Sequence, residues 1–372
     1  IEDVVKILEN TTLIADKIAK SEIYQPLPEP SKVEPLEDLV DRKIIELMDS
    51  PEAIAERILE VAHREKIDSI AGMIRLSYGG KSLVTSKDVE LFEEKTSIDG
   101  YIRCFSDSGS GQWGLGLTHY DVGKIEETTL TAARLALESK NPYPAEPGVY
   151  DVILSPMVVG NLLDVIGYMS SGYAVLMGMS IFMKNKPGDK VASEILSIKD
   201  TPREPMLPGA TAFDDEGVPT RDKNIIEGGK LVTLLHNTKT AAKMGARTTG
   251  NAGWISPHPW NLEIQCGDYS LEEMISEIDR GILVTNNWYT RMQNYVEGIF
   301  STITRDALFE IESGRIKGAL KKLRLSDKLP RMLNNVTAIG REQYYIMWWE
   351  VETPVKVPYI LVKSVRTSKH LI

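Results

Sequence analysis

Cysteine and positive charge are both scarce in this sequence of 372 residues. Its two cysteines, Cys104 and Cys266, lie far apart and form no CxxC pair, which excludes a disulfide scaffold and a cysteine-only zinc ribbon. With 43 Lys and Arg against 53 Asp and Glu, the net charge is −10. An acidic chain is a poor sequence-independent binder of nucleic acid, so we expect no direct nucleic-acid partner.

The common catalytic motifs are also missing. The sequence has no HExxH, no GxSxG, no P-loop and no GxGxxG after a predicted strand. Its five histidines, which include His370, contain no pair at the spacing of a helical zinc site. The sequence begins at Ile1 rather than Met, so we expect residues to be missing before it. No secretory pattern is visible, and we expect a cytoplasmic location.

No long apolar run is free of interruptions. Residues 157–183 carry one charge, Asp164, and are long enough to span a bilayer. Asn161, Ser170, Ser171 and four glycines interrupt the run, and no aromatic belt or Lys/Arg asymmetry flanks it. A buried, glycine-interrupted helix that leads into a loop is therefore favoured over a membrane span.

What is present is the composition of an ordinary globular protein, 42% hydrophobic and 26% charged. Apolar spacing predicts helices at residues 1–20, from 51 onward and at 124–139. Turn signals predict hairpins around Gly79-Gly80, residues 106–111, Gly228-Gly229 and Ser313-Gly314, and Ser270 with Glu273 predicts a capping box. Residues 344–351 and 355–367 are predicted as two strands.

Mixed hairpins and helices without repeated βαβ units indicate an α+β fold. Three prolines within residues 141–148 mark the best domain boundary. We therefore predict an N-terminal helix and hairpin domain at residues 1–147. A C-terminal, hairpin-rich mixed-sheet domain containing the glycine-rich helix is predicted at residues 148–372.

Several polar segments are candidates for a site. The acidic run at residues 213–217 lacks the spacing of a calcium loop and favours a polar turn. His236 follows two leucines at a predicted strand end, where a solvated or structural role is more common than a catalytic one. The small residues 248–253 are typical of a turn, or of a backbone that approaches a ligand closely.

An ordered series of motifs carries a family resemblance. The series comprises residues 213–221 (FDDEGVPTR), 226–231 (IEGGKL), 235–238 (LHNT), 241–245 (AAKMG), 249–252 (TGNA), 257–262 (PHPWNL), 281–285 (GILVT) and 300–314. It resembles the TldD/PmbA family, also called modulators of DNA gyrase. The resemblance implies a cytoplasmic, two-domain, dimeric protein of a metallopeptidase family, in which a zinc-binding TldD-like subunit pairs with a metal-free PmbA/TldE-like subunit. Such a pair acts on small or unfolded peptides.

The resemblance also implies where the zinc motif should stand. Aligning the glycine of the family's HExxxH with Gly167 puts Leu163 and Tyr168 in place of its histidines and Asp164 in place of its glutamate. No cysteine occurs near residues 347–349, where the active subunit takes a further ligand. We therefore expect no metal and no catalytic residue in this chain, with zinc restricted to a TldD-like partner. Catalysis by this chain alone stays an open question.

Three functions remain open on these grounds. The first is a PmbA/TldE-like subunit that completes a peptide cavity with an HExxxH subunit. The second is an active peptidase with atypical ligands drawn from Asp214, Asp215 and His236. The third is a non-catalytic homodimer that binds peptides or another protein. In the first and third, the candidate residues of a substrate cleft are Asp214, Asp215, His236 and Asn251.

Overall fold

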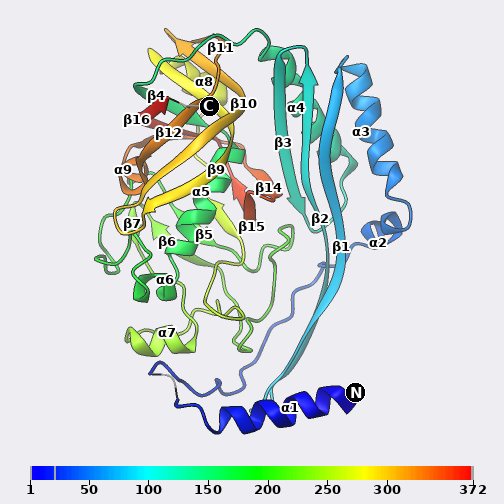
Figure 1. Cartoon of the computed structure of the whole chain (residues 1–372), viewed down its shortest axis with the longest axis vertical. Coiled ribbons are helices and arrows are strands. Elements are labelled where there is room, and N and C mark those ends of the chain that lie inside the picture. The colour runs from blue at the N-terminus through cyan, green and yellow to red at the C-terminus, as the bar shows by residue number, and fades with distance from the viewer. Residues whose placement is uncertain (1, 21, 370–372) are drawn as a thin grey trace.

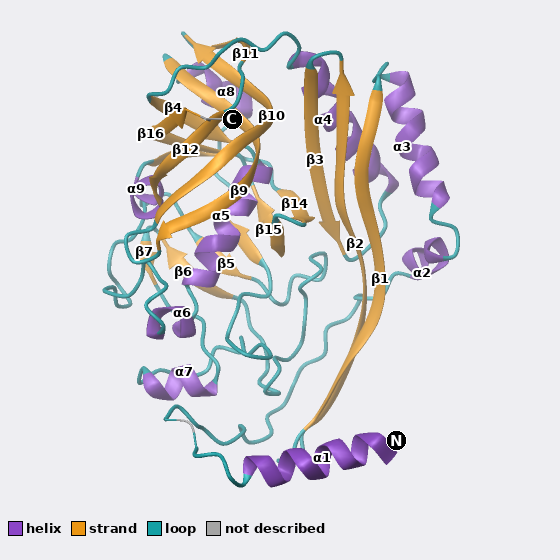
Figure 2. Cartoon of the chain, in the orientation of Figure 1, coloured by secondary structure: helices purple, strands orange, loops and turns teal. Residues whose placement is uncertain are grey.

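The computed structural model describes residues 2–20 and 22–369, and His370 lies outside them. Helices and strands alternate irregularly along the chain, which confirms the α+β class (Figure 2). The helices of the described residues are α1 (Glu2–Ala15), α2 (Arg42–Met48), α3 (Glu52–Arg64), α4 (Val122–Glu138), α5 (Pro156–Met169), α6 (Gly172–Leu176), α7 (Thr238–Lys243), α8 (Leu271–Ser276) and α9 (Leu329–Asn334).

Three long antiparallel strands form the N-terminal sheet, in the order β1 (Ser69–Val84), β2 (Glu90–Ser106) and β3 (Gly109–Leu117). Helix α4 packs against β2 and β3 (Figure 1). Glycines permit this close packing, because a Cβ at Gly111 would lie 2.3 Å from the carbonyl oxygen of Ala132 on α4.

The predicted hairpin at Gly79-Gly80 is wrong. Strand β1 continues through both glycines, which pair with Lys95 and Glu94 of β2. The chain turns instead at residues 85–89, where Asp88 adopts a φ of 58°. A Gly-Gly pair permits a turn but does not require one, and the polar residues near Asp88 supply a better turn. The next hairpin exists as predicted, but its turn is the shorter Asp107-Ser108.

A second sheet closes on itself in the C-terminal half. Its strand order is β11-β10-β12-β16-β4-β9, β13 pairs with β16, and β10 also pairs with β9. The closed ring therefore contains β4, β9, β10, β12 and β16. The strand bounds are β4 (Val149–Leu154), β9 (Arg280–Asn294), β10 (Ile299–Glu312), β11 (Arg315–Ala319), β12 (Leu323–Lys328), β13 (Val336–Ile339) and β16 (Ile360–Lys369).

The third sheet has the order β14-β15-β8-β5-β6-β7. Its strands are β5 (Ile198–Asp200), β6 (Lys223–Glu227), β7 (Lys230–Leu231), β8 (Leu262–Ile264), β14 (Tyr344–Trp348) and β15 (Val351–Val357). The C-terminal segment thus forms three strands, β14, β15 and β16, rather than the two predicted. Trp348 and Val351 pair across a tight turn that divides the first predicted strand.

Three local predictions are confirmed. The hairpin at Gly228-Gly229 has φ values of 53° and 75°, and the one at Ser313-Gly314 has 50° and 76°. Two successive positive φ angles suit a two-residue hairpin. The capping box of Ser270 and Glu273 opens α8.

The domain boundary at residue 148 stays a prediction. Tyr143, within the proline-rich segment before it, is hydrogen-bonded to Ala319 and Lys321.

Helix α5 is the predicted buried, glycine-rich helix, and it packs against β9 and β15. Met157 and Leu163 are at most 1% exposed, whereas Met177 and Met183, beyond the helix, are 56% and 40% exposed. Just after the helix, Gly172 lies close to another backbone segment, and its amide donates to the Leu235 carbonyl at 2.8 Å. Among the described helices, none has the length and apolarity needed to cross a membrane.

Helix α1 is confirmed as a helix, but its apolar stripe is not buried. Val4 and Leu8 are 57% and 61% exposed, and Ile18, which follows the end of the helix, is 66% exposed. In Figure 1 the helix lies at the lower end of the molecule, at the tip of the long β1–β2 hairpin. The apolar spacing therefore predicted the helix without predicting what it contacts.

We expect Met157→Ala, at the buried start of α5, to lower the free energy of unfolding by about 2–5 kcal/mol, because it opens a cavity between packed layers. The matched control, Leu176→Ala on α6, should cost less than about 1 kcal/mol because Leu176 is 39% exposed. Denaturant titration of both variants gives the comparison. Equal losses would contradict the buried placement of α5.

Candidate functional site

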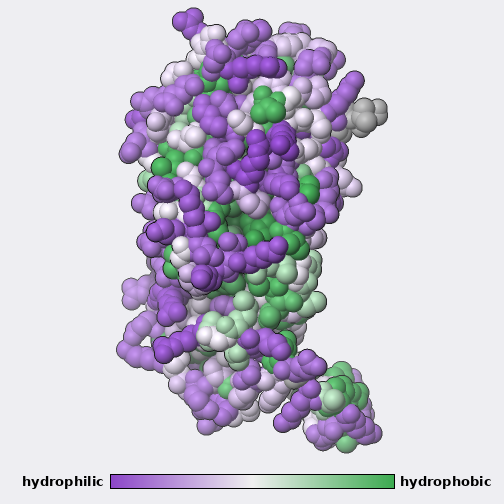
Figure 3. All heavy atoms as spheres, turned by 90° about the vertical axis from the view of Figure 1, so that its left-hand side faces the viewer, coloured by the Kyte–Doolittle hydropathy of each residue, from purple (hydrophilic) through white to green (hydrophobic). Residues whose placement is uncertain are grey.

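A cleft of about 800 Å³ lies beside the C-terminal half of α5. We call it the α5 cleft. Figure 3 shows apolar side chains gathered in a hollowed band across the middle of one face, at the height of α5 and α6 in Figure 1. The residues that matter most below come from β2 (Lys95), α5 (Asp164, Tyr168), a loop (His258, Trp260), β9 (Thr290, Arg291, Met292) and β15 (Glu352, Thr353).

Two of the three degenerate motif positions line this cleft. Asp164 and Tyr168 stand one turn apart on α5 and reach the cleft together, whereas Leu163 is buried in the core. The Asp164 carboxylate accepts hydrogen bonds from the amides of Glu352 and Thr353 at 3.4 and 3.3 Å. The Tyr168 hydroxyl lies 3.7 Å from the Met179 sulfur. Both side chains therefore have protein partners that shape the cleft wall.

These positions do not fit a catalytic zinc ion. Zinc sites need imidazole, thiolate or several carboxylates, and here one carboxylate is accompanied by a buried leucine and a phenol. Burial raises the pKa of Asp164, with backbone hydrogen bonds from Thr353 and Glu352 opposing the rise. Within residues 2–20 and 22–369, no group of three or more His, Cys, Asp or Glu side chains could hold a metal.

Asp214 lies in the polar turn that the acidic run predicted. Its carboxylate is fully buried and accepts the amides of Glu216, Val218 and Ala252 at 2.9–3.0 Å. Burial raises the pKa of Asp214 to about 6, although the three amides act in the opposite direction. Asp215 is half-buried. Its amide donates to the Ala252 carbonyl.

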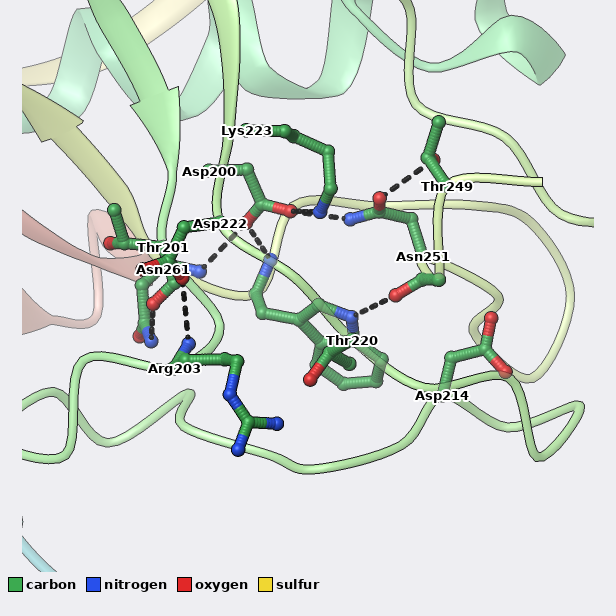
Figure 4. A network of polar contacts seen from close by, with 12 residues as sticks. Asp200, Thr201, Arg203, Asp214, Thr220, Asp222, Lys223, Thr249, Asn251 and Asn261 are labelled. Atoms are coloured by element: carbon green, nitrogen blue, oxygen red, sulfur yellow. Dashed lines mark hydrogen bonds and ion pairs between the residues drawn. The ribbon is translucent and has the colours of Figure 1, made fainter. Parts of the chain in front are cut away.

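Asn251 belongs to a buried network centred on Asp200 (Figure 4). The Asn251 side-chain amide donates to Asp200 at 2.6 Å, and the Lys223 ammonium contacts the same carboxylate oxygen at 2.8 Å. The other Asp200 oxygen accepts the backbone amides of Trp260 and Asn261. Since Asp200 ends β5 and Lys223 begins β6, the network attaches the loop around residues 249–261 to the third sheet.

His236 is buried, with 4% of its surface exposed, so of the solvated and structural roles that its sequence position favoured, the structure supports the structural one. Its ring nitrogen lies 3.2 Å from the Thr240 hydroxyl, and its backbone exchanges hydrogen bonds with Thr249. A Cβ at Gly172 would lie 2.5 Å from the same ring. The histidine therefore fills the space that Gly172 leaves, and its burial lowers the pKa of His236 to about 4.

The four predicted cleft residues thus lie around one loop rather than along the α5 cleft. Asp214 and Asp215 bind Ala252, Asn251 binds Asp200, and His236 binds Thr249. The same loop carries His258 and Trp260 into the cleft wall. Its tip exposes Trp254 and Ile255, at 94% and 78%. A direct substrate contact by these four residues stays a prediction. In the structure, their hydrogen bonds support the loop that carries His258 and Trp260.

Sequence reasoning missed the residues that line the cleft apart from Asp164 and Tyr168. His258 and Trp260 stand within the motif PHPW, which contributed to the family resemblance but was not assigned a role. Lys95 and Arg291 lie in strands whose polar residues looked like ordinary solvent-facing positions. No periodicity distinguishes a strand lysine in a cleft from one in water.

We expect His236 to make stability depend on pH. Its pKa of about 4 in the fold is lower than the ordinary 6.5, so the unfolded chain binds more protons between these values. The free energy of unfolding therefore has its full value above pH 6.5. It decreases by up to about 3 kcal/mol as the pH falls toward 4.

Denaturant titrations at several pH values should give a shallower acid decline for His236→Gln, which has no titrating ring. Parallel pH profiles for the wild type and the variant would contradict this. The control His63→Gln changes a histidine on the surface of α3 and should retain the wild-type profile.

Comparisons with known proteins agree with this architecture. Residues 147–369 match the PmbA/TldA metallopeptidase C-terminal domain. A structure of TldE from Thermococcus kodakarensis superimposes with a TM-score of 0.86 at 22% identity, covering 99% of this chain and 85% of that one. A Thermotoga maritima protein described as a modulator of a DNA gyrase gives 0.83 at 25% identity, covering 92% and 80%.

Relatives named as metalloproteases are similar over part of their length. One from Methanocaldococcus jannaschii is 30% identical over 293 residues, which are 75% of this chain and 64% of that protein. PmbA of Escherichia coli is 31% identical over 166 residues, 44% of this chain and 35% of that protein. This chain thus spans less than two thirds of these relatives. The match over residues 147–369 shows that the chain belongs to the PmbA/TldD family.

Proposed function

We propose that this chain is the non-metal-binding, PmbA/TldE-like subunit of a peptidase complex that acts on small or unfolded peptides. The observation that carries the proposal is the α5 cleft. The cleft is of a size suited to a short peptide, and it borders the α5 positions that the resemblance aligns with the zinc motif of the family's active subunit. In this chain, Asp164 and Tyr168 form part of the cleft wall there, and we propose that they do not bind a metal.

The cleft also offers a strand edge to a peptide. Strand β9 pairs with β4 only at residues 281–284, and its later residues have β10 on one side. Thr290, Arg291 and Met292 of this segment line the cleft. An extended peptide laid along this edge would exchange main-chain hydrogen bonds with β9, a mode that accepts many sequences. Tolerance of sequence is what a peptidase of unfolded chains requires.

The chemistry of hydrolysis would come from a partner subunit with HExxxH, in a heterodimer with this chain. The support for this division is the donor set at α5, which has one backbone-bonded carboxylate and no imidazole. A homodimer that binds peptides without cutting them uses the same cleft. Turnover by a mixture with an HExxxH subunit, and none by either chain alone, separates the two.

We expect the purified chain to hold less than a tenth of a zinc ion per chain after dialysis against zinc, because Leu163 and Tyr168 replace the two imidazoles. Elemental analysis by plasma mass spectrometry gives the number. The double variant Leu163→His with Tyr168→His is the informative companion, since it places imidazoles at the two positions that the resemblance aligns with the motif's histidines. About one tightly held zinc in the unaltered chain would refute the metal-free assignment.

We expect Tyr168→Ala to weaken peptide binding about tenfold, because an aromatic side chain in a cleft supplies contact area at low entropic cost. Tyr168 is 41% exposed, so the fold should tolerate the change. Anisotropy of a fluorescein-labelled, unstructured hexapeptide measures the affinity.

The matched control is Tyr24→Ala, because Tyr24 is 51% exposed and lies outside the cleft lining. Unchanged binding by Tyr168→Ala, or an equal loss in Tyr24→Ala, would place the peptide elsewhere.

A further inference from the structure

Lys95 is an unusual member of the cleft lining. It stands on β2 opposite Gly79 of β1, and its side chain reaches the cleft beside Gly209 and Trp260. Its ammonium donates one hydrogen bond, to the Ala210 carbonyl at 3.1 Å. Among the described residues, no carboxylate forms an ion pair with it. An ammonium carries three donors, so its hydrogen-bonding capacity is largely unused.

The nearest anion is already engaged. Glu93 contacts the Lys81 ammonium at 3.4 Å and accepts a hydrogen bond from the Thr211 hydroxyl. Its second oxygen accepts the Ala212 amide at 2.8 Å. Lys81 also lies 3.8 Å from Asp215. Glu93 and Asp215 therefore serve Lys81 and the loop backbone, and neither they nor Asp164 and Glu352 of the cleft lining form an ion pair with Lys95.

Two other partly buried cations are paired with carboxylates. Lys223 contacts Asp200 at 2.8 Å, and Arg103 contacts Asp306 at 2.6 Å. Such pairing is the rule, since an unpaired charge removed from water is costly. Burial lowers the pKa of Lys95, with Glu93 opposing this effect and Lys81 adding to it. An incoming anion would relieve this cost and gain a charge-assisted hydrogen bond.

His258 lines the same cleft, but burial lowers its pKa and its ring is already hydrogen-bonded to the Ser256 backbone, so the donors free to meet a carboxylate here are those of the Lys95 ammonium. The His258 and Trp260 rings lie 4.5 Å apart and fix each other's position. We propose, on the basis of the function proposed above, that Lys95 binds a carboxylate of the peptide in the α5 cleft.

That carboxylate has two possible sources in a peptide, the free C-terminus and an Asp or Glu side chain. Three N-terminally fluorescein-labelled hexapeptides distinguish them. The first is an Ala/Gly/Leu peptide with a free C-terminus, the second is its C-terminal amide, and the third is that amide with one internal Glu. Fluorescence anisotropy with the full chain at pH 7.5 and low salt gives each affinity.

We expect the free acid, the Glu-containing amide or both to bind about tenfold more tightly than the plain amide. Lys95→Met, which keeps length but removes charge, should abolish the difference. Lys87→Met is the matched control, because it removes one charge from the turn of the same hairpin outside the cleft lining. It should leave the difference intact. The peptide that binds more tightly than the plain amide identifies the bound carboxylate as the C-terminus or the Glu side chain.

Equal affinity for all three peptides in the unaltered chain would overturn the inference while leaving peptide binding in place, and this result needs no variant to fold. A preference that survives in Lys95→Met would overturn it as well. Absence of binding by every peptide would refute the proposed function, and the Lys95 inference with it.

Discussion

The buried Asp200 carboxylate is the interaction on which the candidate site depends. It has no exposed surface, and both oxygens are occupied by an ammonium, a side-chain amide and two backbone amides. The four partners come from three segments: β6, the loop at Asn251 and the stretch before β8. A long, irregular loop has little core of its own, so such polar contacts must replace apolar packing.

The N-terminal sheet and the C-terminal loops act as one wall because Lys81 joins them. Its ammonium contacts Glu93 on the neighbouring strand, the Thr211 hydroxyl, the Phe213 carbonyl and the rings of Phe213 and Trp260. The hairpin β1–β2 is therefore anchored to the loop that carries the cleft residues. Lys95 lies on the adjacent strand, two residues beyond Glu93, the pairing partner of Lys81. The same contacts hold Lys95 in position, but it lacks the partners that Lys81 has.

The sequence predicted local structure better than long-range contacts. The Ser270 capping box, the Gly228-Gly229 turn and helix α5 depend on neighbouring residues and were predictable. The hairpin prediction at Gly79-Gly80 failed because the pairing of sixteen residues on each of two long strands outweighs a local turn preference. The burial of His236 was not predictable because it depends on Gly172, which is 64 positions earlier in the sequence. The cleft was not predictable for the same reason, since its lining comes from distant segments. Family motifs marked the loop near Asn251, whose side chain binds the buried Asp200 carboxylate.

The closed ring of β4, β9, β10, β12 and β16 limits self-association of the protein through its sheet edges. Closure leaves these strands few unpaired backbone groups, and unpaired edges are where sheets of separate molecules join into aggregates. The open segment of β9 is one exception, and it exposes Arg291 and Gln293 as well as Trp288 and Tyr289, so the row is not continuously apolar. Charge and polarity there discourage a second rigid sheet from docking. A single flexible strand can still approach. The same edge can therefore bind a short peptide without promoting aggregation between copies of the protein at high concentration.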